Sequence, residues 1–318
     1  MTVADYVNYG GSQMLQQPYL ANNVSYFGFV VPGDLKALQN VCDERFNKPS
    51  GGAVSFEPAG PFVVMAFNKL THLSSQNPPD SQKGFFAEQE AATWMLVIDR
   101  KRERQFWFQP YIMVDSSYAM ALGREVYGFP KAIAQFVIPD GPDTATELSA
   151  TTLAIRNYSP TSKGEWTKLI EVKQTAPPAS GPAYSTFGDV LEFLREVGGV
   201  LEPQGSIGGD IELALHTLND LLHRRAPMVF LKQFPDVTVA GKACYQSIVE
   251  CDSAMTAFHS AAILHSTFQV NFTPCDSHPI VKDLGFAGQS VTPILSYFVD
   301  FDFEIGVGTE IWNAQGGK

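Results

Sequence analysis

Lys131 is the residue whose position most favours chemistry. It lies in the segment GREVYGFPKAIAQFVI at 123–138, where a glycine-rich turn and Pro130 lead into an otherwise apolar strand. Burial disfavours the charged form of an amine, so an apolar site lowers the pKa of a lysine. The resulting neutral amine adds to a ketone and forms a Schiff base. The alternative is a strand-end lysine whose stem packs while its ammonium reaches water, and the apolar pattern alone favours that alternative.

Other catalytic patterns are absent from the sequence. It contains no GxSxG nucleophile elbow, no HExxH pair and no CxxC spacing among its 4 cysteines, which fit buried thiols in a reducing compartment. Asp300, Asp302 and Glu304 share one face of the last predicted strand, a pattern typical of a solvated strand face rather than of a cation site. We therefore expect no metal and no organic cofactor.

The composition argues against two classes of partner. The chain has 318 residues, of which 45% are hydrophobic, and its 22 basic and 33 acidic residues give a net charge of -11. Nucleic acids and anionic membrane surfaces need basic clusters, so neither is expected as a partner. No apolar run approaches the roughly 20 residues of a membrane span, and the first 15 residues lack the pattern of a signal peptide. We expect a soluble, cytoplasmic protein that acts on a small molecule.

Strands dominate the elements that must position Lys131. Runs rich in aromatic and β-branched residues predict strands at 24–34, 60–70, 105–115, 131–141, 147–160, 226–236, 243–255, 267–272 and 296–308. Two short helices are expected among them, over 34–46, where Asp34 can cap the first turn, and over 116–128, which starts with serines and closes with glycine. Strands from both ends of the chain, without regular helical crossovers, indicate an α+β fold with one large antiparallel or mixed sheet.

The composition changes near residue 174. Residues 174–184, QTAPPASGPAY, are typical of a linker or surface loop. The segments 185–199 and 210–225 then have the apolar spacing of two amphipathic helices. The glycine-rich stretch between them has neither a GxGxxG fingerprint nor the lysine of a phosphate loop, so no nucleotide site is expected there.

Four segments resemble the acetoacetate decarboxylases. ALGREVYGFPKAIA resembles the active-site segment of that family, Gly-Arg-Glu followed by aromatic-Pro-Lys, and Lys131 takes the position of the family's Schiff-base lysine. GFFAEQEAATWMLV is similar to the segment that carries an active-site glutamate, which corresponds to Glu88. PMVFLKQFPD, with the strand pair after it, and FVDFDFEIGVGTEIW are similar to later strands of the family. Four motifs in the right order favour the catalytic interpretation of Lys131.

The resemblance covers about residues 19–140 and 226–312. It therefore makes 174–225 a helical insertion within a single domain that spans 1–318. It also implies a β-rich cone or barrel-like core that encloses the site, with peripheral helices, in a homo-oligomer.

The resemblance implies a mechanism as well as a fold. Lys131 would form an imine with a small-molecule oxo acid, and Glu88 would position or shuttle protons. Glu90 lies on the same strand face as Glu88 if the segment is extended, and the pKa of one of two carboxyl groups so close together would be raised. The candidate substrate contacts are Glu90, Arg124, Tyr127 and Phe129.

Two positions depart from the family pattern. Ala132 stands where the decarboxylases carry a second lysine, and Val24 stands where they carry an arginine associated with the substrate carboxylate. The first hypothesis is decarboxylation of a β-keto acid such as acetoacetate or a larger analogue. The second is aldol or dehydration chemistry on an oxo acid by the same imine. The third is a small-molecule binding protein on this scaffold that has lost catalysis.

Overall fold

The computed structural model describes residues 5–9, 15–176, 183–184 and 226–315. The two helices predicted at 185–199 and 210–225 lie outside the described residues, as does most of the predicted insertion. Of the segment 174–225, the first three residues continue a strand and Ala183–Tyr184 form β9.

Strands make up most of the described chain. They are β1 (Tyr19–Pro32), β2 (Phe56–Pro58), β3 (Phe62–Ser75), β4 (Phe85–Asp99), β5 (Arg104–Val114), β6 (Lys131–Val137), β7 (Glu147–Ala154), β8 (Glu165–Ala176), β9, β10 (Ala226–Pro235), β11 (Ala243–Ile263), β12 (Thr267–Phe272), β13 (Ser290–Val291), β14 (Leu295–Ile305) and β15 (Thr309–Asn313). The helices are α1 (Leu35–Cys42), α2 (Ser117–Leu122) and α5 (Ile280–Leu284), the π-helical turns Asp43–Asn47 and Gly123–Tyr127, and the 3-10 turns Asp80–Gln82 and Pro142–Thr144.

Both predicted helices form, and each begins at the expected cap. The Asp34 side chain accepts a hydrogen bond from the Ala37 amide at the start of α1, and Ser116 does the same for Ala119 at the start of α2. Each helix then continues into one of the π-helical turns, so the predicted spans of 34–46 and 116–128 are covered.

The strands form one mixed sheet, with 15 strands among the described residues. Its order is β13-β12-β8-β7-β6-β5-β10-β11-β14-β1-β3-β4-β2, and β9 and β15 pair with β11. β6 and β10 run parallel to β5. β4 also pairs with β5, so the path returns on itself, but β5 meets β10 only at Trp107 and Met228 and no regular barrel results. The α+β class and the mixed sheet are confirmed.

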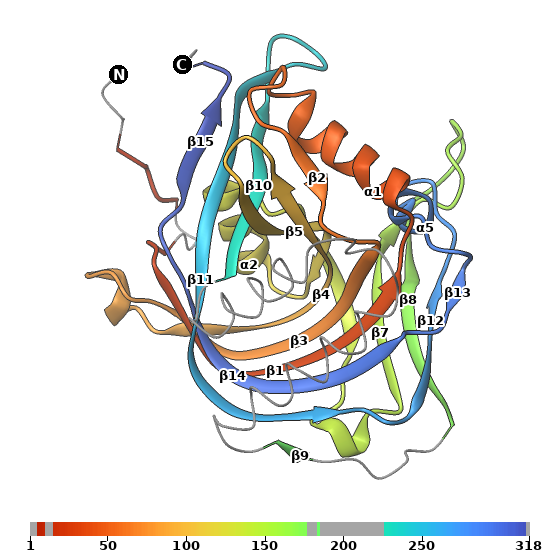
Figure 1. The fold of residues 1–318 in the computed structure, drawn as a ribbon. Helices are drawn as coiled ribbons and strands as arrows, with labels where there is room; N and C mark the ends of the chain where they lie inside the picture. The colour runs from red at the N-terminus through yellow and green to blue at the C-terminus, as the bar shows by residue number, and fades with distance from the viewer. Residues whose placement is uncertain (1–4, 10–14, 177–182, 185–225, 316–318) are drawn as a thin grey trace.

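The long strands bend strongly. Figure 1 shows β11, β14, β1, β3 and β4 curving together like the wall of a bowl, while β7, β8 and β12 rise along one side. Adjacent strands in twisted sheets are rotated relative to one another, and this rotation accumulates over many strands into such curvature.

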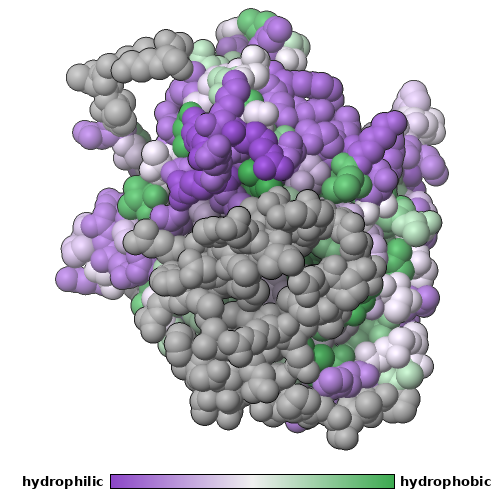
Figure 2. Space-filling view, viewed as in Figure 1, coloured by the Kyte–Doolittle hydropathy of each residue, from purple (hydrophilic) through white to green (hydrophobic). Residues whose placement is uncertain are grey.

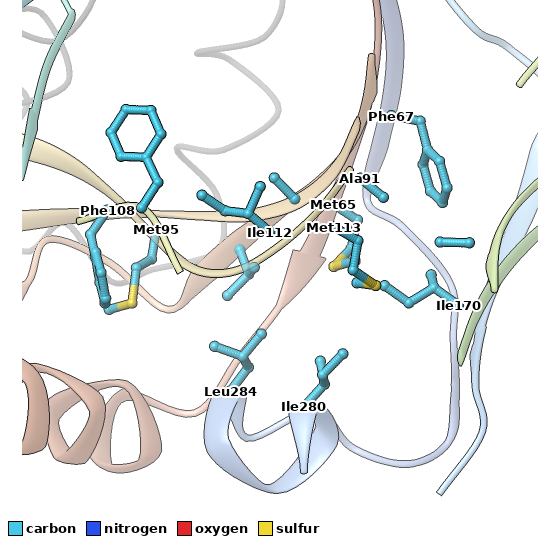
Figure 3. Packing of buried hydrophobic residues seen from close by; sticks show 14 of the residues in the cluster. Met65, Phe67, Ala91, Met95, Phe108, Ile112, Met113, Ile170, Ile280 and Leu284 are labelled. Carbon is cyan, nitrogen blue, oxygen red and sulfur yellow. The ribbon is translucent and has the colours of Figure 1, made fainter. Parts of the chain in front are cut away.

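One face of β1 and β3 forms the main hydrophobic core. Phe27, Phe29 and Phe67 are fully buried there, and the ring of Phe29 meets Phe268 of β12 edge to face, with 5.3 Å between centroids. Figure 3 shows this cluster, in which side chains of the curved sheet meet Ile170 of β8 and the buried residues of α5. Since side chains alternate along a strand, the opposite face of β1, β3 and β4 is left to carry the polar residues described below.

One face of the described surface is largely polar. Figure 2 shows hydrophilic side chains prevailing in the upper half of that view. The large exposed hydrophobic side chains include three small groups. They are Tyr6, Val7 and Tyr9 near the N-terminus, the cross-strand pair Leu153 and Trp166, and Val237 and Val239 in the turn between β10 and β11. Among the described helices, none is long and apolar enough to cross a membrane. The homo-oligomer stays a prediction.

Replacing Gly128 by alanine should destabilise the fold. Gly128 has φ +85°, and a Cβ there would lie 2.5 Å from the Cα of Lys232 on β10. The left-handed backbone and the steric clash together should cost about 2–5 kcal/mol, measured by urea unfolding. Gly141→Ala is the control, because Gly141 has an extended backbone and no atom within 4 Å of a Cβ there. Equal unfolding midpoints for the two variants would contradict the packing described here.

Candidate active site

The segment between α2 and β6 delivers Lys131 to the middle of the sheet. The π-helical turn after α2 ends at Gly128, whose left-handed backbone reverses the chain. The Lys131 amide donates to the Phe129 carbonyl oxygen over 2.7 Å, which closes a tight turn around Pro130. Lys131 is the first residue of β6, and it pairs with Ile112 of the parallel strand β5. The side chain of Lys131 is only 7% exposed, so the interpretation as a strand-end lysine that reaches water is wrong.

Gly123 and Arg124, in the π-helical turn before β6, contact the side chain and the backbone of Lys131, respectively. A Cβ at position 123 would lie 2.8 Å from Cδ and 3.1 Å from Cε of Lys131, so the lysine stem lies directly against the glycine backbone. The Arg124 guanidinium donates from Nη1 to the Lys131 carbonyl oxygen at 3.2 Å. Arg124 therefore positions the backbone of Lys131, and its expected contact with a substrate stays a prediction.

Glu88 and Glu90 face the lysine from β4. They alternate along the strand with Gln89 and are both buried, at 4% and 7% exposure, which confirms that they share one strand face. The Lys131 Nζ lies 3.2 Å from Glu88 Oε1 and 3.5 Å from Glu90 Oε2. The register explains the meeting, because Glu90 faces Val114 of β5 and β5 in turn pairs with the first residues of β6.

Burial and neighbouring charges shift the pKa values of Lys131 and Glu90. Burial is the strongest single effect on Lys131 and disfavours its ammonium, but the attraction of Glu88 and Glu90 outweighs it, so the pKa of Lys131 is raised above its ordinary value. Burial and the neighbouring Glu88 raise the pKa of Glu90 to about 7, although Lys131 acts in the opposite direction. The expectation of a lysine pKa lowered by burial is therefore wrong.

Asn68 completes the polar cluster, and the sequence analysis missed it. It lies on β3 directly opposite Glu90, and its Nδ2 donates to Glu90 Oε1 at 3.1 Å. Tyr26 lies opposite Asn68 on β1, and the pKa of the Tyr26 phenol is raised by burial, by Tyr297 and by Glu90. Asn68 interrupts the apolar run GPFVVMAFNKL, and a polar side chain buried in such a run needs a partner, which was the available signal.

Phe129 and Tyr127 have different surroundings. The Phe129 ring centroid lies 5.7 Å from the Lys131 Nζ, within reach of a cation–π contact. Tyr127 stacks on Phe129 with centroids 5.2 Å apart, and its hydroxyl donates to the Gly306 carbonyl oxygen at 2.7 Å. Phe129 thus forms part of the wall around the amine, whereas Tyr127 anchors that wall to the core. The predicted contact of Tyr127 and Phe129 with a substrate stays a prediction.

The two departures from the family pattern have clear positions. Val24 on β1 faces Leu70 on β3, which faces Glu88 on β4, so Val24 lies on the sheet face that carries the carboxyl groups. Val24 is buried at 1% exposure and brings no charge to that face. Ala132 pairs with Met113 of β5 on the opposite face, because strand side chains alternate.

No group of three His, Cys, Asp or Glu side chains that could hold a metal ion comes together in the part of the chain that the structure describes. Asp302 instead lies 3.0 Å from His259 Nε2 and accepts a hydrogen bond from the Asn23 amide. The absence of a cofactor from the reaction stays a prediction.

A curved mixed sheet with few helices is the fold of the acetoacetate decarboxylase-like enzymes. The chain is similar to the crystal structure of acetoacetate decarboxylase from Legionella pneumophila subsp. pneumophila str. Philadelphia 1, with a TM-score of 0.59 over 99% of this chain and 94% of that chain, at 16% identity. It is also similar to an acetoacetate decarboxylase-like enzyme from Sphingomonas wittichii RW1, with a TM-score of 0.56 over 98% and 100% of the two chains, at 12% identity. The fold implied by the four sequence segments is confirmed.

A third similar structure is the enduracididine biosynthesis enzyme MppR complexed with pyruvate. Its TM-score is 0.54 over 95% of this chain and 94% of that chain, at 12% identity. No protein-family model matches the sequence, and no curated protein sequence matches it. Identities this low establish a shared fold and leave the reaction to be argued from the site.

The pKa of Glu90 should move in opposite directions in two variants. Lys131→Met removes the positive charge that favours the carboxylate, so the pKa should rise above about 7. Glu88→Gln removes the negative neighbour, so the pKa should fall. NMR titration of protein labelled with 13C at the glutamate carboxyl carbon measures both shifts, and Glu90→Gln assigns the signal. The same pKa in both variants would show that the three groups are not coupled.

Proposed function

We propose that this protein is a lysine-imine carbon–carbon lyase that acts on a small oxo acid. The observation that carries the proposal is the buried Lys131 Nζ, which lies within 3.5 Å of both Glu88 and Glu90. An ion cluster in such a place costs desolvation and is weak evidence for stability, so a chemical use is the better explanation of it. The fold shared with acetoacetate decarboxylases of known structure supports the same conclusion.

The carboxyl groups supply the proton transfers that the amine needs. The Lys131 ammonium first gives a proton to the Glu90 carboxylate, and the neutral amine then attacks the carbonyl carbon of the substrate. The hydroxyl group of the tetrahedral adduct takes the proton from Glu90 and leaves as water. A cationic imine remains. A carboxyl group with a pKa of about 7 is matched to such exchange near neutral pH. A raised lysine pKa is thus compatible with an amine nucleophile.

The cationic imine then draws electrons from the neighbouring carbon. In decarboxylation of a β-keto acid, the bond to the carboxylate breaks, CO₂ leaves and the electron pair forms an enamine. A carboxylic acid of the cluster protonates the enamine carbon, and water hydrolyses the imine and releases the ketone. Decarboxylation consumes one proton overall, and Glu90, which gave its proton to the leaving water, takes this proton up from solvent before it protonates the enamine carbon. The mechanism requires neither a metal nor an organic cofactor.

Aldol or dehydration chemistry is the second candidate. MppR has been solved complexed with pyruvate and with the condensation product of pyruvate and imidazole 4-carboxaldehyde. The apolar Val24 on the face that carries Glu88 offers no charge to a substrate carboxylate, which counts against acetoacetate itself as the substrate. The third hypothesis, a binding protein without catalysis, predicts no covalent adduct and is separated by the experiment that follows.

Borohydride trapping should modify Lys131. The protein is incubated with acetoacetate or a longer oxo acid and reduced, and peptide mass spectrometry then locates the adduct. We expect a substrate-dependent secondary amine on Lys131 that is absent from Lys131→Ala, and its mass shows whether CO₂ has left. Lys69→Ala, which removes a half-buried lysine that pairs with Asp140 on the face of β3 opposite Asn68, should leave trapping unchanged. No adduct with any carbonyl compound would sink the proposal in favour of a binding protein.

A further inference from the structure

Two buried oxygen atoms of the polar cluster have no partner. Asn68 Oδ1 and Glu88 Oε2 make no hydrogen bond within the described residues, although their side chains are almost completely buried. Leaving a buried acceptor unpaired is costly, so such atoms call for a partner. We refer to these two oxygens as the acceptor pair.

The acceptor pair lies on the face of the sheet that carries the lysine amine. Asn68 faces Glu90 across β3 and β4, and Glu88 lies one side chain further along the same face of β4. Glu88 uses Oε1 for Lys131 and keeps Oε2 free, while Asn68 uses Nδ2 for Glu90 and keeps Oδ1 free. Each residue therefore binds the catalytic cluster with one polar atom and offers an acceptor with the other.

The chemistry of the acceptor pair limits what can bind there. Both atoms accept hydrogen bonds and neither donates, so the bound group must carry a donor such as a hydroxyl. A carboxylate has no donor, and it would also be repelled by the charge of Glu88. A carboxylate of a β-keto acid is therefore a poor occupant of this position.

We propose that Asn68 and Glu88 bind a hydroxyl group of the substrate, which makes the substrate class a β-hydroxy ketone or a β-hydroxy oxo acid. This inference rests on the proposed imine at Lys131 and selects the aldol cleavage among its possible outcomes. A hydroxyl on the β carbon is four bonds from the imine nitrogen, so the two groups come close together when the chain folds back. One carboxyl group can then touch the nitrogen with one oxygen and the hydroxyl with the other.

The cleavage balances with the groups present. Glu88 takes the proton of the β-hydroxyl, the hydroxyl oxygen becomes the carbonyl of a released aldehyde, and the bond between the α and β carbons breaks. Its electron pair forms the enamine and neutralises the imine nitrogen. Glu88 then returns the proton to the α carbon, and water releases the ketone from Lys131. The hydroxyl has a single hydrogen, which bonds to Glu88 Oε2, so Asn68 Oδ1 orients the hydroxyl through a water molecule that donates to Oδ1 and to the hydroxyl oxygen. Asn68 also donates to Glu90 and takes no proton itself.

A pair of ketones that differ only in the hydroxyl tests the inference. The probes are 4-hydroxypentan-2-one, which would be cleaved to acetone and acetaldehyde, and pentan-2-one. Half-saturation of the borohydride-trapped Lys131 adduct measures binding of both, and reduction of acetaldehyde by alcohol dehydrogenase with NADH measures cleavage. For the wild-type protein we expect cleavage of the hydroxy ketone and half-saturation at an about 10- to 100-fold lower concentration than for pentan-2-one.

Variants of Asn68 separate binding of the hydroxyl from support of the cluster. Asn68→Val should remove most of the preference for the hydroxy ketone, measured as the ratio of the half-saturation concentrations of the two ketones in the same variant. Asn68→Asp keeps an acceptor oxygen and should retain more of the preference than Asn68→Val, and circular dichroism checks that both variants fold. Lys69→Ala changes the adjacent residue on β3 and should behave like the wild type.

The outcomes distinguish this inference from the proposal on which it rests. Trapping of both ketones with no preference and no cleavage would overturn the hydroxyl site and leave the imine intact. Loss of trapping for both ketones in Asn68→Val would show that Asn68 acts through Glu90 and would also overturn the hydroxyl site. No trapping of any carbonyl compound in the wild type would instead overturn the imine itself.

Discussion

The buried contact of one ammonium with two carboxyl groups is the constraint on which the rest of this structure depends. Lys131, Glu88 and Glu90 lie almost wholly out of water, where an unpaired charge is prohibitively unfavourable. Their separations of 3.2 and 3.5 Å must therefore be maintained by the strands that carry them. The mixed pairing of β4, β5 and β6 does this, because it fixes the register of all three residues at once.

Two glycines also help to hold Lys131 in place, because they let backbone segments pass close to the lysine and to β10. Gly123 lets the lysine stem pass within van der Waals contact of the chain, and Gly128 lets the turn before β6 lie against β10. The aromatic wall of Phe129 keeps water from the amine on that side. Lys131 is thus held close to two carboxyl groups. Their attraction for the ammonium outweighs the effect of burial, so the pKa of Lys131 is raised rather than lowered.

The chain shares its fold with acetoacetate decarboxylase and with MppR, and MppR has been solved with pyruvate and with a larger condensation product of pyruvate. In this chain the face around the amine carries Asn68 and Val24, and it lacks a charge at the position of Val24. A site with spare acceptors and no added cation fits an uncharged hydroxyl better than a second carboxylate. On the proposed mechanism, the residues around Lys131 would decide the reaction outcome, since an imine can lead to the breaking of several kinds of bond.

By itself the sequence determined the strand-rich class, the capped starts of α1 and α2, and the arrival of Lys131 at a strand start, because these depend on local spacing and on cap and turn residues. The shared face of Glu88 and Glu90 also followed from alternation. Helix α5 was missed because five residues are too few to show a period. Only the tertiary structure decided that Asn68 joins the cluster, that Arg124 binds the Lys131 backbone and that the lysine pKa is raised. The contact of Asn68 and the pKa of Lys131 depend on distances between strands far apart in the chain. The polar Asn68 in an apolar run indicates only that it needs a partner, and the turn sequence does not show to which atom Arg124 donates.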